Sequence, residues 1–214
     1  MTTSHPTRPG LAALVTAVTA AMTPCAQAAI TGFVGDTTLE GGWFAFEDTF
    51  DVDMTVIHHG GATYETVTGI DVPEFGGSLD FDSAHSLRII GSGWATWSHG
   101  YTGEVFYNNG KYFVGYDLKM NGVHAFDAYV EPNGGGDSYA ITAYGSGGGE
   151  ATVEFWAYWS YGAMHFGFYA PDERIVRFEI DSTGDWAIGE WRVGVPAPGS
   201  LALLALAGTR RRRR

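Results

Sequence analysis

Short runs in which apolar and polar residues alternate fill the middle of the chain. Residues 152–158 place Val153, Phe155 and Ala157 on one face and larger polar or aromatic side chains on the other. Residues 124–130 and 175–180 alternate in the same way. A period of two is typical of antiparallel strands with one buried face. In these two runs the alternation places the following side chains inside: Phe126, Ala128, Val130, Val176, Phe178 and Ile180.

Turn signals separate the alternating runs, as in all-β folds. Asn108-Asn109-Gly110-Lys111 predicts a type I′ hairpin between two aromatic runs, because Asn and Gly tolerate positive φ. Further strands are expected at residues 43–47, 55–58, 63–67, 86–90, 105–107, 112–119, 139–143, 163–169 and 186–193. We expect none of these segments to be helical. The pattern predicts a single antiparallel β-sandwich, jelly-roll-like in topology, over residues 29–194.

The N-terminus has the organisation of a secretory signal peptide. After a mildly basic start, Leu11–Met22 is an apolar run, and Ala26-Gln27-Ala28 is a small-x-small cleavage site. The run is too short to span a bilayer. We therefore expect signal peptidase to remove residues 1–28 and with them Cys25, the only cysteine. A mature chain without cysteine has no disulfide and no thiolate metal site.

The last twenty residues combine a proline-rich break, an apolar segment and a cationic end. These parts are Val195-Pro196-Ala197-Pro198, Leu201–Gly208 and Arg210-Arg211-Arg212-Arg213-Arg214. Their order resembles the PEP-CTERM sorting tail that exosortase recognises in Gram-negative bacteria, with the family's Pro-Glu-Pro replaced by Pro-Ala-Pro. The resemblance implies a transient inner-membrane anchor with cytoplasmic arginines. An exosortase-like processing enzyme would then sort the protein to the cell surface or the extracellular matrix.

A second interpretation of residues 195–214 is a basic tail that binds nucleic acid, but this interpretation gives the apolar segment no role. The charge of the predicted domain also argues against nucleic acid as a partner. Six of the 12 basic residues are Arg8 and Arg210–Arg214, whereas all 24 acidic residues lie between Asp36 and Glu190. Six basic and 24 acidic side chains leave the domain with a net charge of −18. Such a domain repels nucleic acid and anionic membranes and attracts cations.

Two acidic runs are candidates for a calcium site. Asp51 and Asp53 are two residues apart, as are Asp80 and Asp82, so each pair shares a strand face or a loop. Their carboxylates are the hard oxygen ligands that calcium prefers. Neither run matches an EF-hand loop. The alternative is an acidic edge that is simply solvated.

Aromatic residues supply a second candidate site. Trp94 and Trp97 lie in a Gly/Ser-rich segment, and Trp156 and Tyr158 lie on the outward face of a predicted strand. Exposed flat rings can stack on the faces of sugars, so extracellular polysaccharide is the candidate ligand. The alternative is ordinary packing of large aromatic side chains in the core or across strands.

Searches for catalytic motifs find no nucleophile elbow, no phosphate loop and no His-Glu-x-x-His metal motif. We therefore expect no enzymatic activity. Two classes of function remain open. The first is an exported, non-enzymatic cell-surface or matrix protein. The second is a secreted carbohydrate-binding module, or a weak glycan hydrolase, that uses the aromatic face and a carboxylate pair.

Overall fold

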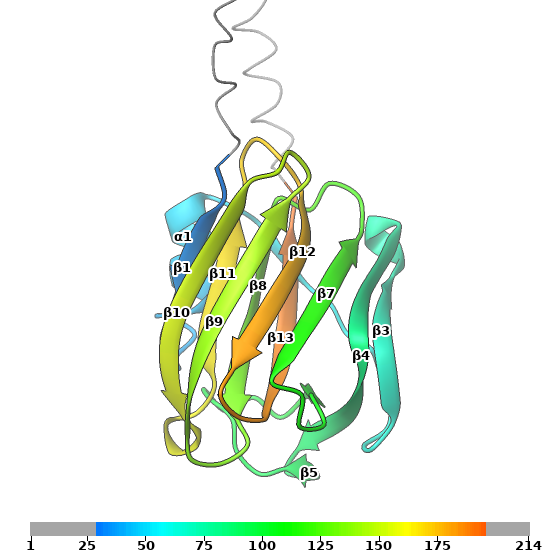
Figure 1. Ribbon diagram of the computed structural model, residues 1–214, viewed down its shortest axis with the longest axis vertical. Helices are drawn as coiled ribbons and strands as arrows, with labels where there is room; N and C mark the ends of the chain where they lie inside the picture. Colours follow the sequence, from blue (N-terminus) through cyan, green and yellow to red (C-terminus); the bar gives the residue numbers. More distant parts are fainter. Residues whose placement is uncertain (1–28, 196–214) are drawn as a thin grey trace, which may run out of the picture.

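The computed structural model describes residues 29–195, and the alternating runs in this range form antiparallel strands (Figure 1). The strands are β1 (Thr31–Val34), β2 (Met54–Val56), β3 (Thr66–Val72), β4 (Gly77–Ile90), β5 (Gly93–Trp94), β6 (Glu104–Tyr107), β7 (Phe113–Lys119), β8 (Ala125–Pro132), β9 (Gly136–Gly145), β10 (Glu150–Tyr158), β11 (Met164–Tyr169), β12 (Ile175–Ser182) and β13 (Trp186–Gly194). The all-β prediction is confirmed.

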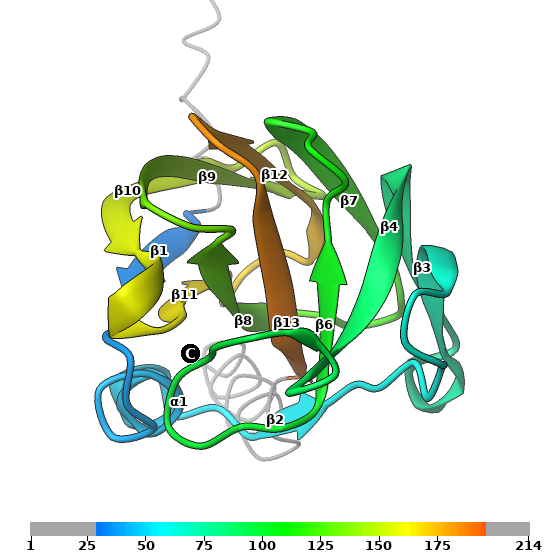
Figure 2. The ribbon, with the colours of Figure 1, turned by 90° about the horizontal axis from the view of Figure 1, so that it is seen from below.

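The strands belong to one sheet with the order β1-β11-β8-β13-β6-β4-β7-β12-β9-β10. β2 pairs with β13, and β3 and β5 pair with β4. The two end strands, β1 and β10, lie close together: a Cβ atom on Gly32 of β1 would overlap with Val153 of β10. Figure 2 shows the strands arranged around one interior. The sheet is therefore nearly closed into a barrel, and the predicted sandwich arrangement is not confirmed.

The long strand β4 changes partners along its length. Residues 86–88 pair with β6, whereas residues 78–81 pair with β7. The turn between β6 and β7 has positive φ at Asn109 and Gly110, as predicted for type I′. However, β6 and β7 do not pair with each other: both lie along β4, so the hairpin prediction is wrong. Because both strands are antiparallel to β4, the turn instead joins two segments that run in the same direction.

The interior is filled by the inward side chains of all the long strands. On β10, Val153 and Ala157 are buried and Phe155 packs against the core, as the alternation predicts. On β12, Phe178 and Ile180 are buried as expected. The remaining residues of this group, Phe126, Ala128 and Val130 of β8, are fully buried. The prediction for Val176 is wrong, because a register shift between residues 175 and 177 turns Ile175 inward instead.

A short helix, α1 (Trp43–Phe50), replaces the strand expected at residues 43–47. Its ring positions Trp43, Phe46 and Phe50 are spaced by three and four residues, which puts them on one helical face. Phe46 is completely buried and packs with Phe33 and Phe50. The helix ends at Asp51, which adopts the left-handed conformation with φ 51°. Two short 3-10 helices, η1 (Pro73–Phe75) and η2 (Trp159–Tyr161), also lie outside the expected strands.

Candidate functional site

A shallow hollow lies on the outward face of β9, between β10 and β12. The small side chains of Ser138 and Ala140 contribute to its floor. Ala140 pairs with Glu154 of β10 on one side and with Asp181 of β12 on the other, so longer side chains flank the small ones. With Trp156, these residues line a volume of about 440 Å³. The hollow therefore combines the exposed ring of Trp156 with two carboxylates and the hydroxyl side chains of Ser138, Ser182 and Thr183.

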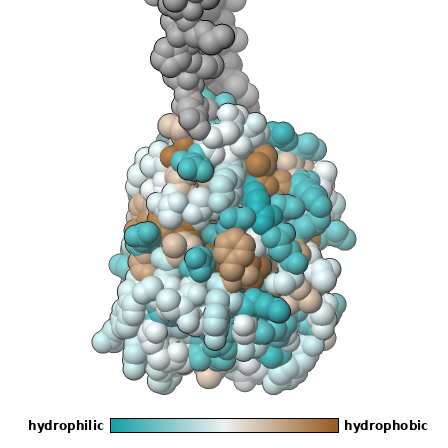
Figure 3. Space-filling model, viewed as in Figure 1, coloured by the Kyte–Doolittle hydropathy of each residue, from teal (hydrophilic) through white to brown (hydrophobic). Residues whose placement is uncertain are grey.

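Trp156 is the most prominent ring beside this hollow and is 55% exposed. Its indole extends over Gly136 of β9, where any side chain would overlap with it. The indole is stacked against Tyr158, with ring centroids 5.5 Å apart, and the ring of Tyr161 follows at 5.7 Å from Tyr158. Trp156 and Tyr158 thus point outward, as the alternation predicts; that they bind a ligand stays a prediction. Figure 3 shows this face, where apolar groups lie among polar ones.

A second hollow, of about 370 Å³, borders the same aromatic segment. Its lining comprises Gly93–Thr96, Pro132–Gly134 and Trp159. Trp159 is 40% exposed, and its backbone N–H donates to the carbonyl of Gly135 at 3.0 Å. The two hollows are therefore neighbours across the turn that joins β8 to β9 and the residues that end β10.

Trp94 and Trp97 do not form an exposed aromatic platform. Trp94 is only 8% exposed, and its Nε1 donates to Glu131 of β8 at 2.5 Å. Trp97 is half-buried, and its Nε1 donates to Glu190 of β13 at 2.5 Å. These indoles attach the segment of residues 91–103 to the outer face of the sheet. Burial raises the pKa of Glu131, because the buried carboxylate loses its hydration.

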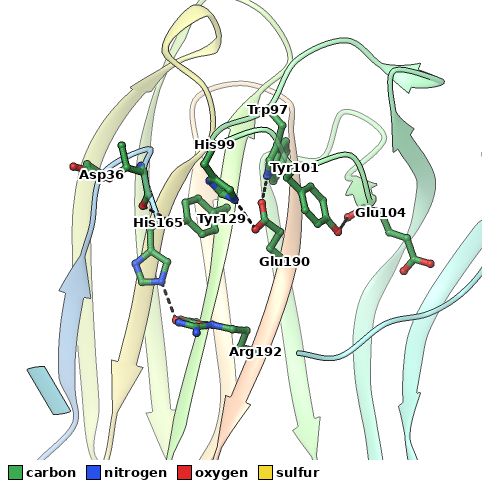
Figure 4. Close-up of polar contacts among 11 residues, drawn as sticks. Asp36, Trp97, His99, Tyr101, Glu104, Tyr129, His165, Glu190 and Arg192 are labelled. Carbon is green, nitrogen blue, oxygen red and sulfur yellow. Dashed lines mark hydrogen bonds and ion pairs between the residues drawn. The ribbon is translucent and has the colours of Figure 1, made fainter. Parts of the chain in front are cut away.

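Glu190 lies at an irregular point of β13. Its φ is 55°, and a register shift separates Gly189 from Arg192 on this strand. The bulge directs the carboxylate to the outer face, where His99 Nε2 contacts it at 2.8 Å beside the Trp97 contact (Figure 4). His99 and Glu190 are both largely covered. The pair therefore belongs to the buried side of the 91–103 segment and does not line either hollow.

A second buried charge cluster holds α1 on the outer face of the sheet. Arg192 of β13 donates through Nε to Asp127 of β8 at 2.9 Å, and through Nη1 to Glu47 of α1 at 2.6 Å. His165 of β11 contacts the other oxygen of Asp127 at 2.9 Å. The guanidinium also lies over the ring of Trp43, 4.3 Å from its centroid. The cluster connects three strands to the helix that covers them.

The acidic runs are separated in the structure. Asp80 and Asp82 share the outward face of β4, but Asp80 pairs with Lys119 at 2.6 Å and Asp82 pairs with Arg177 at 2.5 Å. Hydrogen bonds from these cations lower the pKa of each carboxyl. Asp51 and Asp53 line a hollow of about 350 Å³ at the end of α1. Across residues 29–195, no group of three or more acidic, His or Cys side chains is placed to hold a metal ion.

The alternation alone did not identify the buried charges. The alternation over residues 124–130 puts Asp127 on the outward face of β8, and Asp127 and Glu131 do point away from the barrel interior. They are nevertheless buried, because α1 and residues 91–103 cover that face (Figure 2). Arg192 gives one usable signal, because it is the only basic residue of β13 and Glu190 is the only acidic one. An isolated cation in a predicted core strand indicates a buried partner.

The predicted processing sites lie outside the described residues. These sites are Ala26 and Ala28 of the signal peptide, Pro196, Ala197 and Pro198 of the sorting tail, and Arg210–Arg214. Val195 is the last described residue, is 40% exposed and directly follows β13. Between residues 29 and 195, no helix is long and apolar enough to cross a membrane. Comparisons of the sequence with protein-family models and with curated proteins find no match.

Proposed function

We propose that this is an exported, non-enzymatic cell-surface or matrix protein whose β-domain binds polysaccharide at the hollow beside Trp156. The observation that carries the binding part is the combination of an exposed indole with Glu154, Asp181 and Ser138 around one concavity. Ligand sites typically join an apolar surface to a few convergent polar groups. A flat ring can stack on the C–H face of a sugar while carboxylate and hydroxyl oxygens accept hydrogen bonds from its hydroxyl groups.

The non-enzymatic part is supported by where the acid–base pairs lie. His99–Glu190 and His165–Asp127 are covered by α1 and residues 91–103, away from both hollows. Each carboxylate already accepts hydrogen bonds from an indole or a guanidinium. These pairs act as supports for the covering segments. A general acid or base would need to reach the substrate within hydrogen-bond distance.

The export part is supported by the two ends of the sequence. The resemblance of residues 1–28 to a signal peptide and of residues 195–214 to a PEP-CTERM tail supports a position of the domain outside the cytoplasm. The partners implied are signal peptidase, an exosortase-like processing enzyme and extracellular polysaccharide. Calcium remains a candidate ligand only at the hollow beside Asp51 and Asp53.

Replacing Trp156 with alanine should weaken polysaccharide binding by about tenfold or more, because the ring is the largest contact surface of the hollow. A glycan array identifies the polysaccharide class that the purified protein binds, and titration with that polysaccharide then measures the affinity of the variant. Phe44→Ala is the matched control, since Phe44 is 48% exposed on α1, far along the chain from the hollow. Equal affinities of all three proteins would contradict the site, and an array without any binding would contradict the function.

Deleting Arg210–Arg214 should release the protein from the membrane fraction. The apolar segment Leu201–Gly208 is shorter than the roughly 20 residues that span a bilayer. Each arginine near anionic lipid adds about 1 kcal/mol of binding. Fractionation of cells expressing the full-length and truncated proteins measures retention. A variant with five lysines in place of the arginines keeps the charge and should be retained; equal retention of the truncated protein would refute the anchor.

A further inference from the structure

We infer that the two hollows form one continuous binding track for an uncharged, extended polysaccharide, with Trp159 as a second sugar-stacking residue. The inference rests on the proposed function and extends it in two ways: it adds a second subsite, and it names the charge class of the ligand. The track consists of the hollow on β9, the rings of Trp156, Tyr158 and Tyr161, and the hollow beside Trp159.

The track is continuous because one turn, between β8 and β9, lies beside both hollows. The indole of Trp156 extends over Gly136, and the backbone of Trp159 is hydrogen-bonded to Gly135. The same turn therefore supports the key ring of each hollow. Between the rings the turn presents Gly134 and Gly135, and a Cβ atom at either position would meet nothing within 4 Å. A chain lying from one hollow to the other would meet bare backbone at this point.

The rings along the track are exposed enough to contact such a chain. Tyr161 is 72% exposed, Trp156 55% and Trp159 40%. They lie within six consecutive residues at the end of β10 and in η2. Large aromatic rings grouped on the surface mark a binding surface more often than a solvated one. Because each ring is held by the backbone of a strand end or a short helix, little conformational entropy is lost when a ligand binds.

The charge of the track indicates an uncharged ligand. Glu154 and Asp181 stand on opposite walls of the first hollow. None of the residues that line the two hollows is Lys, Arg or His. An acidic polysaccharide would therefore meet like charge without a compensating cation, which costs binding free energy. Sugar hydroxyl groups, in contrast, can donate to both carboxylates.

A cationic peptide is the other ligand that an acidic surface attracts. The arrangement favours sugar, because exposed rings line both hollows whereas the two carboxylates line only the first. The two ligands differ in their response to salt. Binding of an uncharged chain should change little with ionic strength, whereas attraction between exposed charges is largely screened above about 0.1 M salt.

Affinity electrophoresis of the folded protein tests the inference with defined probes. Gels contain either an uncharged polysaccharide (hydroxyethylcellulose, dextran, xylan or galactomannan) or an acidic one (carboxymethylcellulose, alginate or hyaluronan). We expect retardation by at least one uncharged polymer and by none of the acidic polymers. Hydroxyethylcellulose and carboxymethylcellulose share a backbone, so this pair isolates the effect of charge. Retardation by any of the acidic polymers, or by none of the seven, would overturn the inference.

Two variants separate this inference from the proposed function. Trp159→Ala should weaken binding to the retarding polymer by about tenfold, and Trp159→Phe should restore most of the affinity, because linked subsites reinforce each other. Affinity for oligosaccharides should also rise from disaccharide to octasaccharide in the unmodified protein and level off early in Trp159→Ala. If Trp156→Ala abolishes binding and Trp159→Ala does not change it, the second subsite is refuted while the proposed function stands.

Unaltered thermal unfolding of both variants confirms that each is folded. Binding of an uncharged polymer that disappears in 0.5 M salt would show that ionic contacts dominate at this surface, and it would refute the inference.

Discussion

Replacing Arg192 with leucine is expected to lower the free energy of unfolding by about 3–5 kcal/mol. Arg192 is 3% exposed and supplies two hydrogen bonds to Asp127, which is completely buried. Its third contact, with Glu47, connects the strands to α1. Leucine would leave the carboxylate of Asp127 with only His165 as a partner. An ionised group without its counter-charge in the interior is among the most costly changes in a protein.

Arg177→Leu is the matched control for this prediction. Arg177 contacts more carboxylates than Arg192 does, namely Asp82, Asp117 and Glu179. Its side chain is 27% exposed, however, so water can solvate the carboxylates after the arginine is removed. We therefore expect Arg177→Leu to lower the free energy of unfolding by about 1 kcal/mol or less. Urea unfolding of the three proteins measures both effects. Equal losses for the two arginines would show that burial does not determine the value of these ion pairs.

A double variant identifies the cause of the loss. Asp127→Asn combined with Arg192→Leu removes the buried carboxylate that has lost its counter-charge. The double variant should therefore recover part of the stability that Arg192→Leu loses. Limited proteolysis gives a second measurement, because α1 should become more accessible when Arg192 no longer holds Glu47. Full loss of stability in the double variant would mean that the guanidinium acts mainly by packing on Trp43.

The sequence predicts best those strands that have one face in the core and no irregularity. β10 is such a strand: its inward residues were identified correctly, and the outward positions of Trp156 and Tyr158 followed from them. β12 shows the limit of this reasoning. One register shift moves Ile175 inward and Val176 outward, and no alternation pattern contains the position of a bulge.

Helix α1 shows a different kind of failure. Trp43, Phe46 and Phe50 carry helical spacing, but the segment is only eight residues long, and short apolar runs suit both periods. Its helical form is stabilised by packing against Phe33 and the sheet, which local pattern does not reveal. The early half of β4 was not predicted as a strand either, because this strand of 14 residues pairs with β7 in its first part and with β6 in its second.

The candidate site was predictable only where it is local. Trp156 and Tyr158 belong to one strand, so the sequence places them together. Trp94 and Trp97 bind carboxylates that lie 37 and 93 residues away along the chain, and these partners turn both indoles into buried supports. The hollow on β9 also needs β12: β9 and β10 are consecutive strands, whereas Asp181 of β12 pairs with Ala140 from far along the chain. Which strands pair over such a distance depends on the whole sheet and cannot be predicted from the local sequence pattern.

Acidification from pH 7 to pH 4 is expected to cost about 3 kcal/mol of stability through His85 alone, at 1.36 kcal/mol for each unit of pKa difference. His85 is completely buried, and this burial lowers its pKa from 6.5 to about 4. Its Nδ1 donates to the carbonyl of Ser83 at 2.9 Å, so Nε2 is the acceptor for the hydroxyl of Tyr116 at 2.8 Å. The native state therefore holds a neutral imidazole. Between pH 6.5 and 4 the unfolded chain binds a proton that the folded chain does not, and stability falls as the pH falls.

Two variants and a direct titration test this prediction. His85→Gln keeps an acceptor and a donor in the same place but cannot titrate, so its unfolding free energy should depend much less on pH between 6.5 and 4. Tyr116→Phe removes the hydroxyl and leaves the buried imidazole, and it should keep the steep pH dependence. The imidazole proton signal of His85, followed by NMR, should titrate near pH 4. A midpoint near 6.5, or equal pH profiles for His85→Gln and the unmodified protein, would show that water reaches this part of the core.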